Sequence, residues 1–246
     1  MEPTVGKERL KKLRGLARRK AREESGLQLL EGPRLVAEAL AAGRVSELFV
    51  RRDRAEYWSD LAGQVPLHAI DDHDLSKIAD VKTAQEIIGV GPLPDFLEPQ
   101  ALLAHHDRVL VLDAVQDPGN VGTLCRSARA LGLDAVLFLP GTADPTSPKV
   151  LRASAGTLLR LGLAKAEDPG PLIESEHTLV LPVVRGGEDL TTIPRPDRFA
   201  LVAGNEAAGT TLQSDSALKV TIPMAHGVES LNVAVACAVI LGRWLG

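Results

Sequence analysis

The amino-acid sequence predicts an α/β protein of two domains, the second of which is built on a parallel sheet. With 246 residues, the chain is too long for one average domain and suits two of ordinary size. Apolar strand-like runs alternate with helical patterns in both halves, as in sheets that helices cover on both faces. The segment 91–94, Gly-Pro-Leu-Pro, is the best linker candidate. We therefore expect a small domain over residues 1–95 and a larger one over residues 106–246, with the boundary between residues 92 and 106.

The first half alternates short strand and helix signals and contains no catalytic constellation of its own. After an apolar run at 27–30, Gly32 and Pro33 open a helical pattern that ends at Gly43. Strands are expected at 47–50, 67–70 and 86–90, and helices at 55–63 and 72–79. This alternation predicts a compact α/β unit in front of the linker.

The second half opens on residues 108–113, a nearly continuous apolar run that suits a strand buried on both faces. Further strands are expected at 135–139, 179–184, 199–203 and 218–222, and helices at 121–131 and 230–245. The stretch 231–244 is too short to cross a bilayer, which needs about 18 to 20 apolar residues, and it contains Asn232 and Arg243. We expect no membrane span, no secretory signal and a cytoplasmic protein.

Charge is unevenly distributed along the chain. The net charge is −4, but residues 1–26 carry nine Lys and Arg against four Glu, which leaves the remainder strongly acidic. Such an asymmetry indicates a basic segment that meets phosphates, although a solvated helix face explains the charge equally well. The two cysteines, Cys125 and Cys237, are far apart in apolar contexts, so we expect packing residues and neither a disulfide nor a metal site.

Three polar clusters follow apolar strands, where open α/β sheets bind their ligands. The first runs from Asp113 through Pro118-Gly119-Asn120 and Gly122 to Arg126, a turn followed by a helix whose N-terminus can receive an anion. Taken alone, it also fits an ordinary strand–turn–helix with a surface arginine.

The other two clusters lie near the C-terminus. Leu201-Val-Ala-Gly204-Asn205-Glu206 ends a strand in a glycine, an amide and a carboxylate, a pattern that many loops contain by chance. Ile222-Pro-Met224 leads to Glu229-Ser230-Leu231-Asn232, where Ser230 or Asn232 can cap the last helix. Without the other clusters, this pattern indicates only a capped C-terminal helix.

In this order and spacing, the three clusters resemble the signature motifs of the SpoU family of the SPOUT methyltransferase superfamily. Residues 31–40, Glu-Gly-Pro-Arg-Leu-Val-Ala-Glu-Ala-Leu, resemble the family's small substrate-binding domain. Glu86 after Gln85 departs from the Gln-Gly common in relatives. The resemblance implies a deep trefoil knot in the last third of the chain, a homodimer whose active site both subunits complete, and S-adenosylmethionine as cofactor.

The resemblance also implies residue roles. Gly204, Ile222 and Leu231 are expected to contact S-adenosylmethionine largely through backbone, with Met224 nearby. The expected catalytic and substrate-positioning residues are Asn120, Arg126, Glu206, Ser230 and Asn232. The expected RNA contacts are Lys11, Lys12, Arg18 and Arg19 of the basic segment, Arg34 of the first domain, and Arg152. No metal is expected.

The predicted reaction is methylation of a ribose 2′-hydroxyl, more plausibly in ribosomal than in transfer RNA. The family suggests Arg126 as general base, which is awkward because a guanidinium stays protonated in proteins. Arg126 can instead hold a phosphate, with Glu206 as the alternative base. Methylation of a base nitrogen, a catalytically inactive RNA-binding or ribosome-assembly factor, and a nucleotide-dependent oxidoreductase are the competing hypotheses. No Gly-x-Gly-x-x-Gly supports the last of these.

Overall fold

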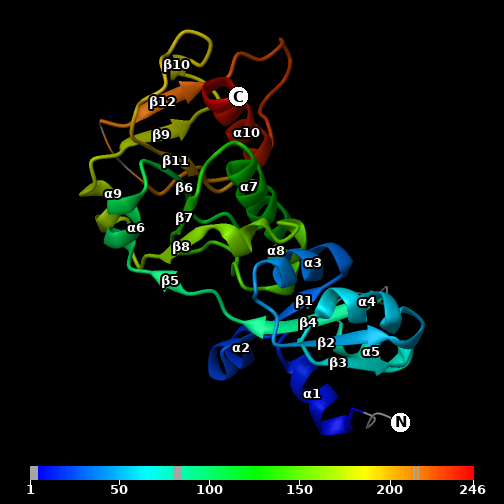
Figure 1. Ribbon diagram of the computed structural model, residues 1–246. Helices are drawn as coiled ribbons and strands as arrows, with labels where there is room; N and C mark the ends of the chain where they lie inside the picture. The colour runs from blue at the N-terminus through cyan, green and yellow to red at the C-terminus, as the bar shows by residue number, and fades with distance from the viewer. Residues whose placement is uncertain (1–4, 80–84, 213, 215) are drawn as a thin grey trace. The chain divides into compact units, whose positions relative to one another are not determined.

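The chain forms two compact units, each of which is described by itself. Figure 1 shows the computed structural model, which describes residues 5–79, 85–212, 214 and 216–246. The first unit comprises Met1–Pro94 with Asp144–Leu159, and the second comprises Asp95–Ala143 with Arg160–Gly246. The return of residues 144–159 to the first unit is a feature that the sequence-based division at 92–106 did not include.

The first unit is a mixed four-stranded sheet with helices on both faces. The strand order is β1-β4-β2-β3, and only β2 and β3 pair in parallel. The elements are α1 (Lys7–Gly15), α2 (Arg19–Ser25), β1 (Leu27–Glu31), α3 (Pro33–Ala41), β2 (Glu47–Arg51), the 3-10 turn η1 (Arg52–Arg54), α4 (Ala55–Ala62), β3 (Leu67–Ile70), α5 (Asp72–Ile78) and β4 (Ile87–Pro92). In Figure 1, α3 and α4 lie on one side of the sheet, and α1 and α5 on the other.

The basic segment is not a free arm, because its apolar residues belong to the core of the first unit. Leu10, Leu13 and Leu16 are at most 5% exposed and pack in one cluster with strand residues such as Phe49 and Ile88. Apolar spacing of three residues puts Leu10 and Leu13 on one face of α1, with Leu16 just after the helix, and leaves the charged side chains in solvent. The segment is therefore a structural part of the domain.

Buried polar contacts between Arg22 and the segment 144–159 stabilise this unit. The Arg22 guanidinium is 2% exposed; it pairs with Asp144 and donates to Thr146 Oγ1 at 3.1 Å and to Leu16 O at 2.9 Å. Burial opposes the charged form of Asp144, but hydrogen bonds from Thr146 and Arg22 outweigh it and hold the pKa of that carboxyl below its usual value.

A second ion pair links the same returning segment to β1. Helix α8 (Pro148–Ala153) carries Arg152, which pairs with the fully buried carboxylate of Glu31. The 3-10 turn η2 (Thr157–Arg160) follows α8.

The second unit contains an eight-stranded sheet in the order β10-β12-β9-β11-β6-β7-β8-β5, in which every pairing is parallel. The strands are β5 (Phe96–Leu97), β6 (Arg108–Leu112), β7 (Ala135–Phe138), β8 (Gly162–Lys165), β9 (Thr178–Pro182), β10 (Glu188–Asp189), β11 (Phe199–Ala203) and β12 (Leu218–Thr221). The central strands are buried on both faces, as the apolar run at 108–113 predicted.

Helices cover both faces of this sheet (Figure 1). They are α6 (Pro99–His105), α7 (Pro118–Ala130), α9 (Gly170–Ile173) and α10 (Val233–Leu245). Helix α10 packs along α7, and α6 packs against α9 with alternate residues of the strands beneath. No helix among the described residues is long and apolar enough to cross a membrane.

Candidate functional site

The first site element is the start of α7, at the carboxyl end of β6. Asp117 caps this helix, because its carboxylate accepts the N–H of Asn120 at 2.8 Å, and Pro118 occupies the first helical position. The helix thus begins before the predicted residue 121, and Gly122 is a buried residue inside it instead of its first turn. The cap fixes Asn120 at the sheet edge.

The second element is a tight loop after β11. Asn205 and Gly209 exchange two backbone hydrogen bonds of 2.8 and 2.9 Å, and Glu206 projects from between them. A Cβ at Gly204 would lie 2.6 Å from Gly209 C and Thr210 N, so the loop itself requires a glycine at that position. The backbone of Gly209 and Thr210 thus approaches Gly204 closely.

The third element is the start of α10, and its capping fixes a chain of amide groups. Asn232 is the cap: its Oδ1 accepts the N–H groups of Ala234 at 2.9 Å and Val235 at 3.4 Å. Because Oδ1 of this amide faces the helix, its Nδ2 group points the other way. Asn232 Nδ2 donates to Asn120 Oδ1 at 3.0 Å. Asn120 in turn directs Nδ2 at Glu206 and donates to Oε1 at 2.6 Å. Three predicted site residues from three elements thus form one oriented network.

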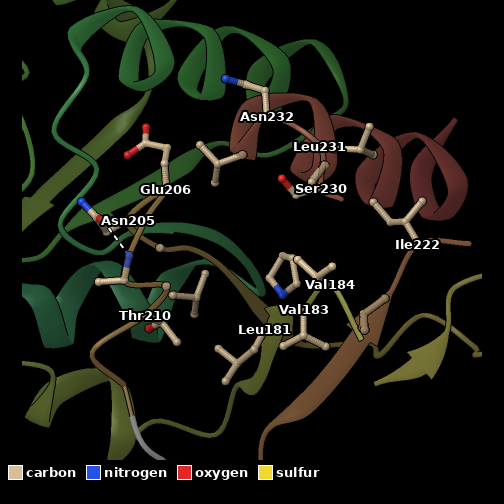
Figure 2. A pocket seen from close by; sticks show the side chains of 18 of the residues that line it. Leu181, Val183, Val184, Asn205, Glu206, Thr210, Ile222, Ser230, Leu231 and Asn232 are labelled. Atoms are coloured by element: carbon tan, nitrogen blue, oxygen red, sulfur yellow. Dashed lines mark hydrogen bonds between the residues drawn. The ribbon is translucent and has the colours of Figure 1, made fainter. Parts of the chain in front are cut away.

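This network lies beside a cavity of about 610 Å³ at the carboxyl ends of β9, β11 and β12. Figure 2 shows Asn205 and Glu206 on one side of the cavity and Ile222 with Val184 on the other. Its lining includes all four predicted cofactor residues, Gly204, Ile222, Met224 and Leu231, and three of the predicted catalytic ones, Glu206, Ser230 and Asn232. Among the described residues, Glu206 is the one ionisable group that lines the cavity.

Arg126 and Ser230 are placed differently from the network. Arg126 is exposed on α7, does not line the cavity, and makes no hydrogen bond or ion pair within the described part of the chain. Arg129, one turn further on, pairs with Asp134. Ser230 lines the cavity but does not cap α10, the role that the sequence left open between it and Asn232.

The predicted RNA contacts all lie in the first unit. Lys11, Lys12 and Arg18 are exposed and have no ion-pair partner among the described residues, whereas Arg19 pairs with Glu23. Arg34 lines a smaller cavity of about 210 Å³ at the start of α3. Arg152 lines the same cavity, as do Gln85 and Gly32.

Some lining residues were not predicted from the sequence. Leu181 in β9 and Val183 and Val184 just after it form one wall, and Thr210 lies in the loop after Glu206. The end of the expected strand at 179–184 was the available signal, because parallel neighbours of a ligand-binding strand end at the same edge.

The cysteines lie inside the helical layer and not in the site. Burial raises the pKa of both the Cys125 and the Cys237 thiols to about 12. Neither is therefore a reactive thiolate near neutral pH. Among the described residues, no group of three or more His, Cys, Asp or Glu is placed to hold a metal ion.

Comparison with known families assigns both parts of the chain. Residues 107–242 match the SpoU rRNA Methylase family, and residues 7–89 match an MRM3-like substrate binding domain. The chain belongs to the SpoU rRNA methylase family. This confirms the resemblance carried by the three clusters and by residues 31–40.

Individual relatives match over nearly the whole length. The 23S rRNA (guanosine(2553)-2′-O)-methyltransferase RlmP of Bacillus subtilis is 34% identical over 95% of this chain and 94% of its own. A TrmH-family putative RNA methyltransferase from Porphyromonas gingivalis superposes with a TM-score of 0.84 at 30% identity, covering 98% of each chain. The SpoU methyltransferase AviRb of Streptomyces viridochromogenes, in complex with AdoMet, gives 0.83 at 25% identity, covering 97% of each.

Proposed function

We infer that this SpoU-family protein transfers a methyl group from S-adenosylmethionine to a ribose 2′-hydroxyl of ribosomal RNA. The observation that carries the inference is the oriented Asn232–Asn120–Glu206 network at the edge of a ligand-sized cavity. Relatives that match the whole chain act on ribosomal RNA or were crystallised with AdoMet, which supports both the substrate class and the cofactor.

The cavity fits S-adenosylmethionine in size and chemistry. Its volume lies in the range of sites for small-molecule ligands, with apolar walls and a few polar groups on one side. Gly204, Ile222, Met224 and Leu231 would hold the cofactor. When bound, S-adenosylmethionine supplies an electrophilic methyl group on a sulfonium. The negative charge of Glu206 beside the cavity suits a positively charged ligand.

Glu206 is the proposed general base for the 2′-hydroxyl proton. Asn120 occupies its Oε1, while Oε2 has no hydrogen-bond partner among the described residues and is free to accept a proton. Because α10 fixes the amide of Asn232, and Asn232 fixes that of Asn120, the carboxylate is held without reorganisation during reaction. A base of this kind contributes about 10²- to 10⁴-fold in rate.

Arg126 is proposed to bind an RNA phosphate rather than to remove the proton. Since it lies outside the cavity of its own chain, a second copy would bring it to the active site. The exposed apolar side chains of α10 support a homodimer: Val235 and Val239 lie four residues apart on one face of the helix and are 48% and 41% exposed.

Sedimentation of Val235→Glu/Val239→Glu tests this homodimer. We expect a dimer for the wild type, a monomer for the variant, and a dimer for Ile173→Glu, which charges an exposed isoleucine outside α10. A wild-type monomer would contradict the two-subunit active site.

The deep trefoil knot is part of the same proposal. Strand β11 lies between β6 and β9, β12 lies beyond β9, and α10 returns to pack on α7. This order of elements allows the chain after β11 to pass through the preceding loops, as a knot requires. An experimental structure in which the chain after β11 passes outside the preceding loops would refute it.

RNA is proposed to contact the first unit at two places. One is the exposed face of α1, where Lys7, Lys11 and Arg14 share a side, continued by Lys12 and Arg18. The other is the cavity lined by Arg34 and Arg152. Arg19 and Arg152 already pair with Glu23 and Glu31, so an RNA phosphate at either arginine would compete with an ion pair.

Two assays test the proposal. Unmodified 23S ribosomal RNA transcript should acquire a 2′-O-methyl nucleotide, detected by mass spectrometry of the digest, and Glu206→Gln should lose about 10²- to 10⁴-fold in rate. Methylation of transfer RNA alone, of a base, or of nothing would each contradict the assignment.

Cofactor binding is tested by calorimetry with S-adenosylmethionine. Val184→Trp adds bulk at an exposed position of the cavity wall and should abolish binding, whereas Ile173→Trp, equally exposed but outside the cavity, should not. Gly204 is a poor position for this purpose, because any side chain there collides with the loop itself.

A further inference from the structure

Asp113 is a buried carboxylate that the proposed chemistry does not use. It follows β6, is 1% exposed, and its backbone N–H donates to Ala203 O at 2.9 Å. Its side chain accepts the Thr210 hydroxyl at 2.7 Å, the Thr211 N–H at 2.5 Å and the Thr211 hydroxyl at 3.0 Å. Burying a carboxylate is costly unless hydrogen bonds replace the hydration that it loses. Here the side-chain hydrogen bonds all come from one loop, through Thr210 and Thr211.

The same loop is tied at its other end to the next residue of the chain. Asn205 Nδ2 donates to Ala114 O at 3.1 Å, and Asn205 Oδ1 accepts the N–H groups of Ala207 and Ala208 at 3.0 Å each. Ala114 adopts a left-handed φ of 55°, a strained conformation for a residue with a Cβ. Its carbonyl is thereby presented in a fixed direction.

We propose that Asp113 and Asn205 are positioning residues for Glu206. The dipeptide Asp113-Ala114 holds both ends of the 205–211 loop, so Glu206, between the two ties, stays opposite Asn120. Neither residue needs to touch the reacting atoms. This inference rests on the proposed role of Glu206 as general base.

A double-mutant cycle with Glu206→Gln tests the inference. Single-turnover methyl transfer to ribosomal RNA is measured at saturating cofactor for Asn205→Ala, Glu206→Gln and the double variant. A misplacement of about 1 Å costs up to about 10²-fold, so Asn205→Ala should slow the wild type about 10- to 100-fold. In the Glu206→Gln background it should cost less than about 3-fold, because nothing is left to position.

Thr211→Val removes a hydroxyl donor to Asp113 at an exposed position while leaving the backbone contact, so the fold should tolerate it. We expect about a 3- to 10-fold loss of rate, absent again in the Glu206→Gln background. The matched control is Thr191→Val, because Asp189 accepts the N–H and hydroxyl of Thr191 in the same way away from the cavity. That control should keep the wild-type rate.

The possible outcomes separate the two ideas. If Asn205→Ala and Thr211→Val cost the same factor in both backgrounds, they act independently of Glu206 and the positioning role is wrong, while the methyltransferase assignment stands. If Glu206→Gln itself keeps the wild-type rate, the base assignment fails and the positioning role falls with it. Melting temperature and cofactor affinity near wild type distinguish lost positioning from lost folding.

Discussion

Arg22 in the first unit and Arg126 in the second both lie on helices, but their surroundings are opposite. Arg22 is buried, and a carboxylate, a hydroxyl and two backbone carbonyls receive its donors. Arg126 is exposed, and no group in the described chain receives its donors. Both arginines lie on helical segments with other basic residues, so the sequence alone does not separate the arginine that stabilises the fold from the one proposed to bind a phosphate.

The largest expected effect comes from Arg22→Ala. Removing one partner of a buried ion pair costs about 3–5 kcal/mol, since the other charge stays buried and unpaired. Hydrogen exchange followed by mass spectrometry should show faster exchange in β1, while β6 in the other unit is unchanged. Arg19→Ala is the control: its exposed pair with Glu23 is worth about 0.3–0.5 kcal/mol. Equal effects of the two variants would mean that Arg22 is not a structural arginine.

The next effect is on catalysis. Arg126→Ala should lower the single-turnover rate of RNA methylation about 10²-fold, because a phosphate that is no longer held lets the reacting ribose shift by about 1 Å. Arg129→Ala, on the same helix but already paired with Asp134, should change it little.

Arg126→Lys then distinguishes a charge role from a need for guanidinium geometry. Most of the activity should survive in Arg126→Lys if a point charge on the phosphate is sufficient. If Arg126→Ala kept the wild-type rate of methylation, the proposed phosphate-binding role of Arg126 would be wrong.

Much of the second unit could be predicted because its central strands, such as β6 and β11, are continuously apolar and buried. The strand at 199–203 has the predicted bounds, and the glycine, amide and carboxylate after it do lie at a ligand-sized cavity. Asn232, one of the two residues predicted as alternatives to cap the last helix, is its N-cap. Contacts among Asn120, Glu206 and Asn232 could not be derived from spacing, since they join residues 86 and 112 positions apart.

The first unit was harder to predict. Helices α1 and α2 carry so much charge that the buried leucines at 10, 13 and 16 did not stand out from the pattern of a solvated helix face. Glu86 departs from the pattern common in the family. Its carboxylate accepts hydrogen bonds from the Trp58 indole N–H at 3.1 Å and from the Arg54 guanidinium at 3.0 Å. The return of residues 144–159 depends on two ion pairs whose partners are more than a hundred residues apart.

A smaller effect is expected from the exposed basic face of α1. Replacing Lys7, Lys11 and Arg14 with Gln should weaken binding to ribosomal RNA about tenfold near 0.15 M salt. It should also reduce the slope of log K against log salt by about 0.7–0.9 for each phosphate that the protein no longer neutralises. Cofactor affinity should be unchanged. Lys20→Gln is the control, because Glu24 already pairs with Lys20 and Lys20 is not among the expected RNA contacts. If the slope did not change, the proposal that the exposed face of α1 binds RNA phosphates would be wrong.

The smallest effect concerns His177, which lies in the second unit before β9. Burial lowers the pKa of His177, although its hydrogen bond to the backbone at His106 opposes the shift. The unfolded chain therefore binds a proton more readily, and stability that is present above about pH 6.5 is lost as the pH falls towards the folded-state pKa. Urea midpoints between pH 7.5 and 5.5 should fall with acidification, and less steeply in His177→Gln. Because His106 lies beside this contact and burial lowers its pKa too, His106→Gln should remove a further part of the slope. A slope unchanged in both variants would assign the acid sensitivity to groups elsewhere. Asp144 of the first unit is excluded above about pH 4, because the pKa of that carboxyl is lowered.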